Sequence, residues 1–385
     1  MNNFTLHLPT KVLFGKGQIA EIKNQIPTGA KILMTYGGGS IKRNGVYDQV
    51  LDALKGFEIV EFPGIEPNPQ FSTLMKAVEL GRREKVDFLL AVGGGSVLDG
   101  TKFIASAINF QGDEWEIVKS HGTVIKSALP IGAILTLPAT GSEMNGNAVV
   151  SRKETQDKLG FFSPFVKPQF SVLDPTTTFS LPPRQTANGV VDAFVHTFEQ
   201  YMTYPVDAKV QDRFAEGVFL TLIEEGPKAL AEPENYDVRA NIMWAATMAL
   251  NGILGVGVPQ DWASHGIGHE LTAQYGLDHG QTLAIVVPTI MWHQREFKKE
   301  KLVQFAQRVW GYQGNDREQA IRVAIDKTRA FFEQMGTPTR LSAYGIDDSQ
   351  FPSVLSKLKE HKTENLGEHK NIDIKAAEEI LRLAL

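Results

Sequence analysis

Val86-Asp-Phe-Leu-Leu-Ala-Val92 leads directly into Gly93-Gly94-Gly95-Ser96-Val97-Leu98-Asp99. The first seven residues are almost all apolar, which is typical of a strand that is buried on both faces of a parallel sheet. A helix-like segment, residues 97–109, follows the glycines. A buried strand, a glycine loop and a helix in this order predict an α/β domain.

The same alternation runs through the first half of the chain. Lys31-Ile-Leu-Met-Thr-Tyr36 is an apolar run that also stops at three glycines. Further strands are expected at residues 57–62 and 131–137, and helices at residues 46–54 and 71–83. Apolar strands that alternate with helices indicate a parallel sheet covered on both faces.

The pattern changes near Leu181-Pro182-Pro183, where strand-like runs give way to long helical periodicities. Helices are expected at residues 185–201, 208–223, 238–250, 262–275, 282–292, 302–310, 317–335 and 374–383. Because proline punctuates chain boundaries, we expect an α/β domain at residues 1–182 and an all-helical domain at residues 183–385.

Composition narrows the class of protein. A chain of 385 residues favours two domains. The net charge of −5 argues against a nucleic-acid-binding protein. The chain has no cysteine, so disulfides, cysteine-ligated zinc, Fe–S clusters and thiol nucleophiles are excluded. Neither a signal peptide nor a membrane span is evident, and a cytoplasmic protein is expected.

Histidines gather in the predicted helical half. Asp192 and His196 are four residues apart, so they share one face of a helix, and His265 and His269 repeat this spacing. One such pair alone is usually a surface pair or a satisfied core contact. Here, however, the polar residues stand among apolar neighbours and need partners. A carboxylate and imidazoles suit Zn²⁺ or Fe²⁺, so Asp192, His196, His265 and His279 are predicted to hold one divalent metal ion.

The glycine loops predict a bound phosphate group. Glycines after a buried strand let the backbone approach a phosphate, which the first N–H groups of the next helix can bind. A plain strand-to-helix turn with Ser96 as N-cap is the alternative. Neither loop has the Gly-x-Gly-x-x-Gly or the Walker pattern, but two loops on successive parallel strands would meet at one edge of the sheet.

The earlier loop also bears on the choice of cofactor. Enzymes that use NAD usually place an acid near the ribose 2′-OH. In Gly37-Gly38-Gly39-Ser40-Ile41-Lys42-Arg43 the next acid is Asp48. A hydroxyl and two cations suit a 2′-phosphate, which favours NADP(H), unless Lys42 and Arg43 merely solvate a helix end.

Together these motifs resemble the iron-type (group III) alcohol dehydrogenase family, and within it the NADPH-dependent aldehyde reductase and butanol dehydrogenase branch. The likeness begins at Leu13-Phe14-Gly15 and covers essentially the whole chain. It is carried by Tyr36-Gly-Gly-Gly-Ser40, Gly64-Ile-Glu-Pro-Asn-Pro69, the loop from Gly93 to Asp99, Leu135-Thr-Leu-Pro-Ala-Thr-Gly-Ser-Glu143, Asn188-Gly-Val-Val-Asp-Ala-Phe-Val-His196 and the pattern of His265, His269 and His279.

The resemblance implies a Rossmann-like dinucleotide-binding domain, a helical metal- and substrate-binding domain as in dehydroquinate synthase, and a cleft between them. It implies that Asp192, His196, His265 and His279 bind Fe²⁺, Zn²⁺ or Mn²⁺, that His269 is the catalytic histidine near the reacting carbonyl, and that the protein is a homodimer. The cofactor contacts that it implies are Gly37, Gly38, Gly39, Ser40, Asn68, Gly94, Gly95, Ser96, Asp99, Thr136, Thr140, Asn147 and Lys158.

The chain departs from the family at two positions. Pro138 stands in a loop that is Thr-Thr-Ala-Gly-Thr in many members, and it removes a backbone donor. Glu270 follows His269 where many members have proline.

The expected activity is reversible hydride transfer between NADP(H) and small to medium aldehydes or primary alcohols. A lyase of the dehydroquinate synthase type would need many lysines, arginines and asparagines around the metal, whereas His196 and His265 have apolar or small neighbours. Oxidation of a polyol, as in glycerol dehydrogenase, is another alternative. Glycerol dehydrogenases normally prefer NAD, however, and the loop from Gly37 to Ser40 argues against NAD. A nucleotide-binding module with a structural zinc is the alternative outside enzymes, but structural zinc sites are often rich in cysteine.

Overall fold

The computed structural model describes residues 1–361 and 363–385, and the chain divides into two compact units. One unit is formed by His7–Leu181 with Pro233–Thr247. The other is formed by Met1–Leu6, Pro182–Glu232 and Met248–Leu385. The sequence-based division at residues 182 and 183 places Met1–Leu6 and Pro233–Thr247 with the opposite halves. Residues 233–247 pack with the sheet because Met243 of α8, Tyr236–Leu250, joins the small apolar cluster of Leu135 and Leu173.

The first unit is built on a six-stranded parallel sheet in the order β1-β8-β5-β4-β2-β3. The strands are β1 Lys11–Phe14, β2 Lys31–Tyr36, β3 Glu58–Phe62, β4 Phe88–Gly94, β5 Ile131–Leu137 and β8 Phe170–Leu173. An antiparallel hairpin of β6, Asn147–Arg152, and β7, Asp157–Phe162, stands apart from this sheet. The α/β class predicted from the sequence is confirmed.

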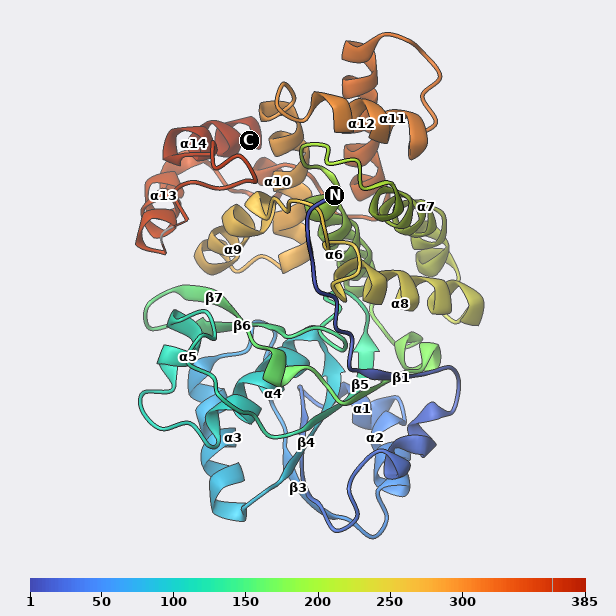
Figure 1. The fold of residues 1–385 in the computed structure, drawn as a ribbon, viewed down its shortest axis with the longest axis vertical. Helices are drawn as coiled ribbons and strands as arrows, with labels where there is room; N and C mark the ends of the chain where they lie inside the picture. The colour runs from blue at the N-terminus through green and yellow to red at the C-terminus, as the bar shows by residue number, and fades with distance from the viewer. Residues whose placement is uncertain (362) are drawn as a thin grey trace. The chain divides into compact units, whose positions relative to one another are not determined.

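Alternate residues of the central strands feed two apolar cores, one on each face of the sheet. Leu89 and Ala91 of β4 pack in the core that the sheet forms with α3, Phe71–Glu84, and α4, Gly95–Ala107. Phe88, Leu90 and Val92 pack in the opposite core, against α2, Val46–Ala53, and the 3-10 helix η1, Gln18–Asn24. This alternation is the period of two that a buried strand imposes. Figure 1 shows α3 and α4 on one side of the strands and α2 on the other.

Shorter elements complete the α/β unit: α1 Ser40–Arg43, α5 Trp115–Lys119, and the 3-10 helices η2 Pro164–Val166 and η3 Pro175–Thr178.

The second unit is helical, and α6, Pro183–Tyr201, runs through its centre with nearly every residue from Thr186 onward buried. Around it lie α7 Lys209–Ala231, α9 Ala263–Tyr275, α10 His279–His293, α11 Lys299–Arg308, α12 Arg317–Gln334, α13 Phe351–Glu360 and α14 Ile374–Leu383, with the short η4 Leu341–Tyr344 and η5 Asp348–Gln350. Among the described residues, no helix has the length and hydropathy that crossing a bilayer requires.

An aromatic cluster fixes one side of α6. The ring of Phe194 lies 4.7 Å from that of Phe219 on α7, 6.3 Å from Phe305 on α11, and 5.2 Å from Phe332 on α12. Rings at these separations bury large apolar areas and add edge-to-face attraction. The central helix is therefore held rigidly against three others.

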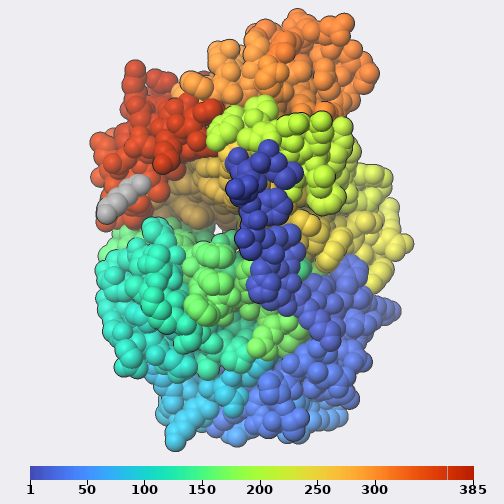
Figure 2. Space-filling view, viewed as in Figure 1, coloured from blue at the N-terminus to red at the C-terminus, as the bar shows by residue number. Residues whose placement is uncertain are grey.

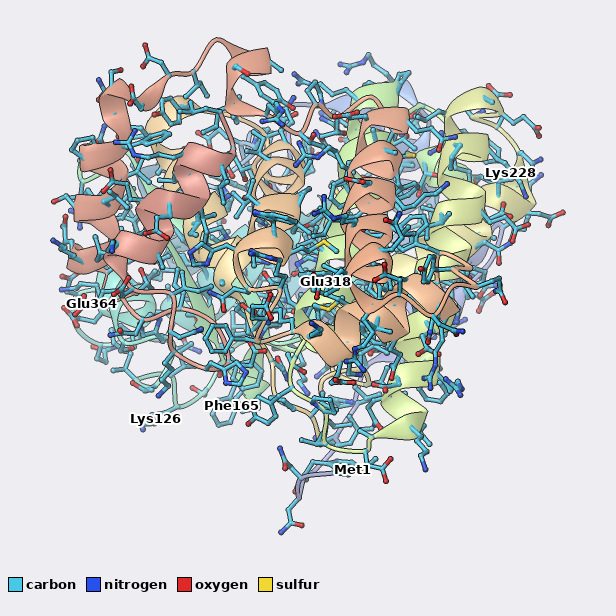
Figure 3. The ribbon with its side chains drawn as sticks, turned by 90° about the horizontal axis from the view of Figure 1, so that it is seen from above. Met1, Lys126, Phe165, Lys228, Glu318 and Glu364 are labelled. Carbon is cyan, nitrogen blue, oxygen red and sulfur yellow. The ribbon has the colours of Figure 1, made fainter. Side chains whose placement is uncertain are left out.

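The outer faces of the helical unit are charged. Lys228 and Glu318, both labelled in Figure 3, are exposed on α7 and α12, where Lys228 pairs with Glu224 and Glu318 with Lys299. The first residues, dark blue in Figure 2, lie on the surface, where the N–H of Asn2 donates to Gly257 O at 2.8 Å. The exposed ion pairs of Lys228 and Glu318 contribute little to the free energy of unfolding.

Candidate metal centre and cofactor loops

One face of α6 carries three buried ionisable side chains. Asp192, His196 and Glu199 follow one another at spacings of four and three residues. At about 100° per residue they fall within an arc of roughly 60°, and Phe194 points to the opposite side. All three side chains are buried, and Glu199 is 0% exposed. The aromatic cluster thus anchors one side of α6 while the other side presents polar groups.

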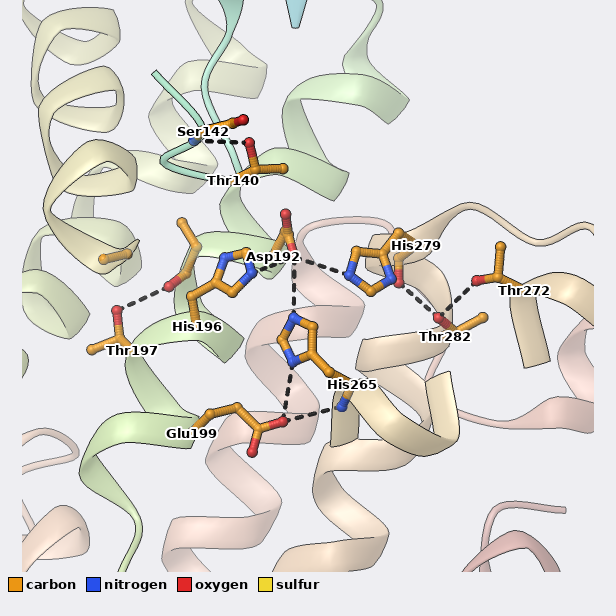
Figure 4. Close-up of polar contacts among 12 residues, drawn as sticks. Thr140, Ser142, Asp192, His196, Thr197, Glu199, His265, Thr272, His279 and Thr282 are labelled. Atoms are coloured by element: carbon orange, nitrogen blue, oxygen red, sulfur yellow. Dashed lines mark hydrogen bonds and ion pairs between the residues drawn. The ribbon is translucent and has the colours of Figure 1, made fainter. Parts of the chain in front are cut away.

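The structure brings together the four side chains that the sequence predicts as metal ligands (Figure 4). Oδ1 of Asp192 lies 3.6 Å from Nε2 of His196, 4.0 Å from Nε2 of His265 and 3.7 Å from Nε2 of His279. The ligand atoms of Asp192, His265 and His279 all lie within 4.8 Å of one another. His196 joins this group through Asp192, and its ring stacks on that of His265 at 4.8 Å.

These distances suit ligands of a common ion better than hydrogen bonds. They exceed the usual donor–acceptor separation of about 3 Å. Ligands about 2.1 Å from a tetrahedral ion stand roughly 3.4 Å apart. Asp192 and His196 are each 4% exposed and His265 is 8% exposed. A carboxylate oxygen and three imidazole nitrogens in so buried a place fit a divalent ion such as Fe²⁺, Zn²⁺ or Mn²⁺.

His265 is also held from behind by a carboxylate that the sequence reading did not single out. Oε1 of Glu199 lies 3.1 Å from Nδ1 of His265 and accepts the backbone N–H of the same residue at 3.1 Å (Figure 4). Burial, and next the nearby Asp261 carboxylate, raise the pKa of Glu199 to about 8. Oε1 can accept an N–H from Nδ1 as well as from the backbone of His265, and in that tautomer Nε2, the ring nitrogen nearest Asp192, carries the lone pair.

The third histidine opens α10. Asp278 is its N-cap, with a capping box to Gln281. Asn188 of α6 donates to Asp278 at 2.7 Å. A Cβ on Gly280 would lie 2.8 Å from the carbonyl oxygen of Asn188, so only glycine lets the first turn of α10 come this close to α6. This contact sets the position of His279.

His269 and Trp262 border the four predicted ligands. The ring of His269, which is partly buried, lies 5.1 Å from that of His279 and 6.0 Å from that of His265. The indole of Trp262 lies 5.2 Å from the ring of His265. Trp262 has a φ of 64°, a left-handed conformation that is strained for a bulky residue and that clusters at functional sites. Glu270, the departure from the family, pairs with Nδ1 of His361 at 2.7 Å.

In the α/β unit, close packing explains the second glycine loop. A Cβ on Gly93 would lie 2.6 Å from Val97, and one on Gly95 would lie 2.6 Å from Thr140. The helix α4 begins at Gly95, two residues before the predicted start, and its N-cap is Gly94. The alternative that Ser96 caps the helix is therefore wrong.

The predicted cofactor residue Asp99 braces a neighbouring loop. It accepts a hydrogen bond from Ser142 Oγ at 2.7 Å and from the N–H of Val149 at 3.0 Å. Lys102, which the sequence reading missed, is 0% exposed and donates to Ser142, to Asn145 and to the carbonyl of Asn147. Burial lowers the pKa of Lys102 to about 8. These two residues shape the loop from Thr140 to Asn147.

The remaining predicted cofactor residues have varied surroundings. Thr136, in β5, and Lys158, in β7, are buried, Asn68 has a φ of 55°, and Thr140 Oγ1 accepts the N–H of Ser142. Asn147 is exposed at the start of β6.

The first glycine loop leaves open space beside a held cation. A Cβ on Gly38 would meet nothing within 4 Å, and Gly39 has a φ of 91°. Nζ of Lys42 lies 4.4 Å from the ring centre of Tyr47 and 5.3 Å from that of Tyr36. Both phenol groups donate to Glu61 at 2.7 Å. Lys42 is thus packed on two rings near the loop that opens α1.

Both halves of the chain match models of one protein family. Residues 9–175 match the model of the iron-containing alcohol dehydrogenase family, and residues 186–384 match the model of the C-terminal part of the Fe-containing alcohol dehydrogenase family. The NADPH-dependent aldehyde reductase of Escherichia coli (strain K12) is 62% identical, with 100% of both chains covered. The probable NADH-dependent butanol dehydrogenase 1 of Bacillus subtilis (strain 168) is 42% identical, again over 100% of both.

Solved structures agree with these matches. A crystal structure of the same E. coli K-12 protein has a TM-score of 0.99 at 61% identity, covering 100% of this chain and 99% of that one. The NADH-dependent butanol dehydrogenase A of Thermotoga maritima has a TM-score of 0.95 at 38% identity, with the same coverage.

Proposed function

Since the chain belongs to the iron-containing alcohol dehydrogenase family, we propose that it reduces small to medium aldehydes to primary alcohols with NADPH, and that it also catalyses the reverse oxidation. The observation that carries the proposal is the buried group of one carboxylate and three imidazoles on α6, α9 and α10. The relatives named for aldehyde reduction and butanol oxidation support both directions.

Asp192, His196, His265 and His279 are the residues proposed to hold the ion. A divalent ion bound there supplies Lewis acidity, which polarises a carbonyl group and offsets the negative charge that develops on its oxygen. The oxygen and nitrogen ligands suit Fe²⁺, Zn²⁺ and Mn²⁺ alike.

His269 is proposed to move the proton. NADPH bound here would supply a hydride to the carbonyl carbon and leave as NADP⁺, and the carbonyl oxygen must gain a proton to give the alcohol. The ring of His269 lies beside two of the proposed ligands and is only partly buried, so it can exchange protons with solvent. A positioned acid or base of this kind contributes about 10²–10⁴-fold in rate.

The two glycine loops are proposed to bind NADP(H). Gly94, Gly95 and Ser96 open α4, a helix of 13 residues whose first N–H groups suit a pyrophosphate. Gly37, Gly38, Gly39 and Ser40, with Lys42, are proposed to face the 2′-phosphate, since a Cβ at Gly38 would meet nothing within 4 Å and Lys42, which also pairs with Glu61 at 3.9 Å, supplies a positive charge there.

Asn68, Thr136, Thr140, Asn147 and Lys158 are proposed as further contacts of the cofactor. Asp99 is proposed to act by shaping the loop that carries Thr140.

A direct spectrophotometric assay tests this function. Purified protein is mixed with NADPH and butanal, with and without a chelator, and absorbance of the reduced cofactor is followed before and after Fe²⁺, Zn²⁺ or Mn²⁺ is restored. NADPH consumption that stops with the chelator and returns with an ion is the expected result. Tight NADPH binding without turnover over aldehydes from acetaldehyde to octanal would instead favour a nucleotide-binding module.

We also propose that the protein is a homodimer and that it is cytoplasmic. Light scattering tests the oligomeric state, and cell fractionation tests the localisation.

A further inference from the structure

We propose that Glu199 is a positioning residue of the metal centre: one buried carboxylate oxygen sets both the tautomer and the ring orientation of His265. The inference rests on the metal site proposed above and names a residue that the four ligands leave out. Glu199 touches neither substrate nor cofactor in this role, because it acts only through His265.

The geometry restricts His265 at two points with one atom. Oε1 of Glu199 is 3.1 Å from the backbone nitrogen of His265 and 3.1 Å from Nδ1 of its ring. The first contact satisfies an N–H in the first turn of α9, where the N-cap residue, Trp262, offers no side-chain cap. The second leaves Nε2 with its lone pair directed toward Asp192. A histidine that binds a metal through one nitrogen usually donates the other N–H to such a partner.

The same helix carries the ligands and this carboxylate. Asp192, His196 and Glu199 lie on one face of α6, so the distance between the proposed ion and the atom that orients His265 is set by helix geometry. Glu199 is 0% exposed, and water therefore cannot compete for Nδ1. Two elements far apart in the sequence, α6 and α9, are joined at this point.

An ion network beside Glu199 anchors the start of α9. Asp261 accepts the N–H of Ala263 at 2.7 Å and pairs with Nζ of Lys298 at 2.6 Å. Lys298 also pairs with Glu368 at 2.8 Å. The first turn of α9 therefore keeps an anchor when Glu199 is replaced, and we expect Glu199 variants to fold.

The test compares ion affinity in three variants of Glu199. Zn²⁺ is titrated into metal-free protein in competition with a chromophoric chelator, and the visible spectrum of Co²⁺ reports the geometry of the site. Glu199→Ala removes the acceptor and should weaken Zn²⁺ binding about 10–100-fold. Glu199→Gln keeps an acceptor oxygen and should stay within a few-fold of wild type. Glu199→Asp keeps the charge but loses the reach, and should bind more weakly than Glu199→Gln.

Glu270→Gln is the matched control. Glu270 is 5% exposed, lies on the same α9 and pairs with a histidine, His361, that is not among the proposed ligands. Its Zn²⁺ affinity should equal that of the wild type.

The outcomes separate the two proposals. If wild type and Glu270→Gln bind Zn²⁺ and folded Glu199→Ala binds it equally well, the role of Glu199 is refuted. A loss of Zn²⁺ affinity in Glu199→Gln as large as that in Glu199→Ala also refutes the role, because the charge of Glu199 and not its positioning of His265 would then determine the affinity. If Glu199→Ala does not fold, the other two variants decide. Tighter Zn²⁺ binding by Glu199→Gln than by Glu199→Asp supports the proposal, and tighter binding by Glu199→Asp overturns it. Failure of wild type itself to bind any ion would overturn the metal site and, with it, this inference.

Discussion

Replacing Gly280 with alanine tests how closely the first turn of α10 must approach α6. A Cβ at this position would lie 2.8 Å from the carbonyl oxygen and 2.9 Å from the Cα of Asn188. Non-bonded carbon atoms prefer about 3.5–4.0 Å, so the turn must retreat by roughly 0.6 Å. Both clashing atoms belong to the backbone of α6, which cannot rotate away as a side chain would.

His279 immediately precedes Gly280 and would move with it. Because metal–ligand distances tolerate deviations of only about 0.2 Å, we expect Gly280→Ala to weaken Zn²⁺ binding by at least about tenfold. Overpacking of this kind also destabilises a fold by about 1–3 kcal/mol, part of which the better helix propensity of alanine offsets.

Gly217→Ala is the matched control. Gly217 lies inside α7, and a Cβ there would meet nothing within 4 Å. The change should leave Zn²⁺ binding unaltered and raise the free energy of unfolding by about 0.5–1 kcal/mol. Both variants are compared with wild type by chelator competition and by urea unfolding of the metal-free proteins. Wild-type Zn²⁺ affinity in Gly280→Ala would refute the close contact and its role in placing His279.

Three further predictions address the proposed mechanism, the cofactor and the pH dependence. His265→Ala should lose metal and activity together, whereas His269→Ala should keep its metal and turn over about 10²–10⁴-fold more slowly; metal loss in His269→Ala, measured by elemental analysis, would make His269 a ligand. Lys42→Ala should raise KM for NADPH about tenfold, as expected for loss of about 1.4 kcal/mol, and leave KM for NADH unchanged, with Arg43→Ala as comparison; equal effects on both cofactors would contradict contact with the 2′-phosphate. The pKa of Lys102 is about 8 in the folded protein, against an ordinary lysine value of 10.5, so the unfolded chain binds more protons between these values and stability should rise with pH there, by about 3 kcal/mol. Urea unfolding against pH should lack this rise in Lys102→Met, and an identical rise in the variant would show that Lys102 is not its source.

The fold was predictable where the sequence repeats one physical pattern. β2, β4 and β5 are apolar on both faces and end in glycine or proline loops, so their strands and the α/β class follow from the residues. β1 and β8 have only four residues each, too few to show a period. The β6–β7 hairpin was missed for another reason, since its polar residues read as a loop. The helix α13, Phe351–Glu360, was also not predicted from the sequence.

The candidate site shows the same division. The four proposed ligands could be named because carboxylate and imidazole at helical spacing have few other uses among apolar residues. Glu199 was missed because a glutamate near a helix end is usually exposed, although its spacing of seven residues from Asp192 places it on the ligand face. Lys102 stands in an almost wholly buried helix, and a cation there signals a buried partner that only the fold reveals.

Anomalous diffraction at the absorption edge of a bound ion tests the central claim most directly, with crystals grown in Fe²⁺ or Zn²⁺. We expect one peak at about 2.0–2.2 Å from Asp192 Oδ1 and from Nε2 of His196, His265 and His279. A crystal without a peak among these four atoms, from protein that still reduces butanal with NADPH, would contradict it.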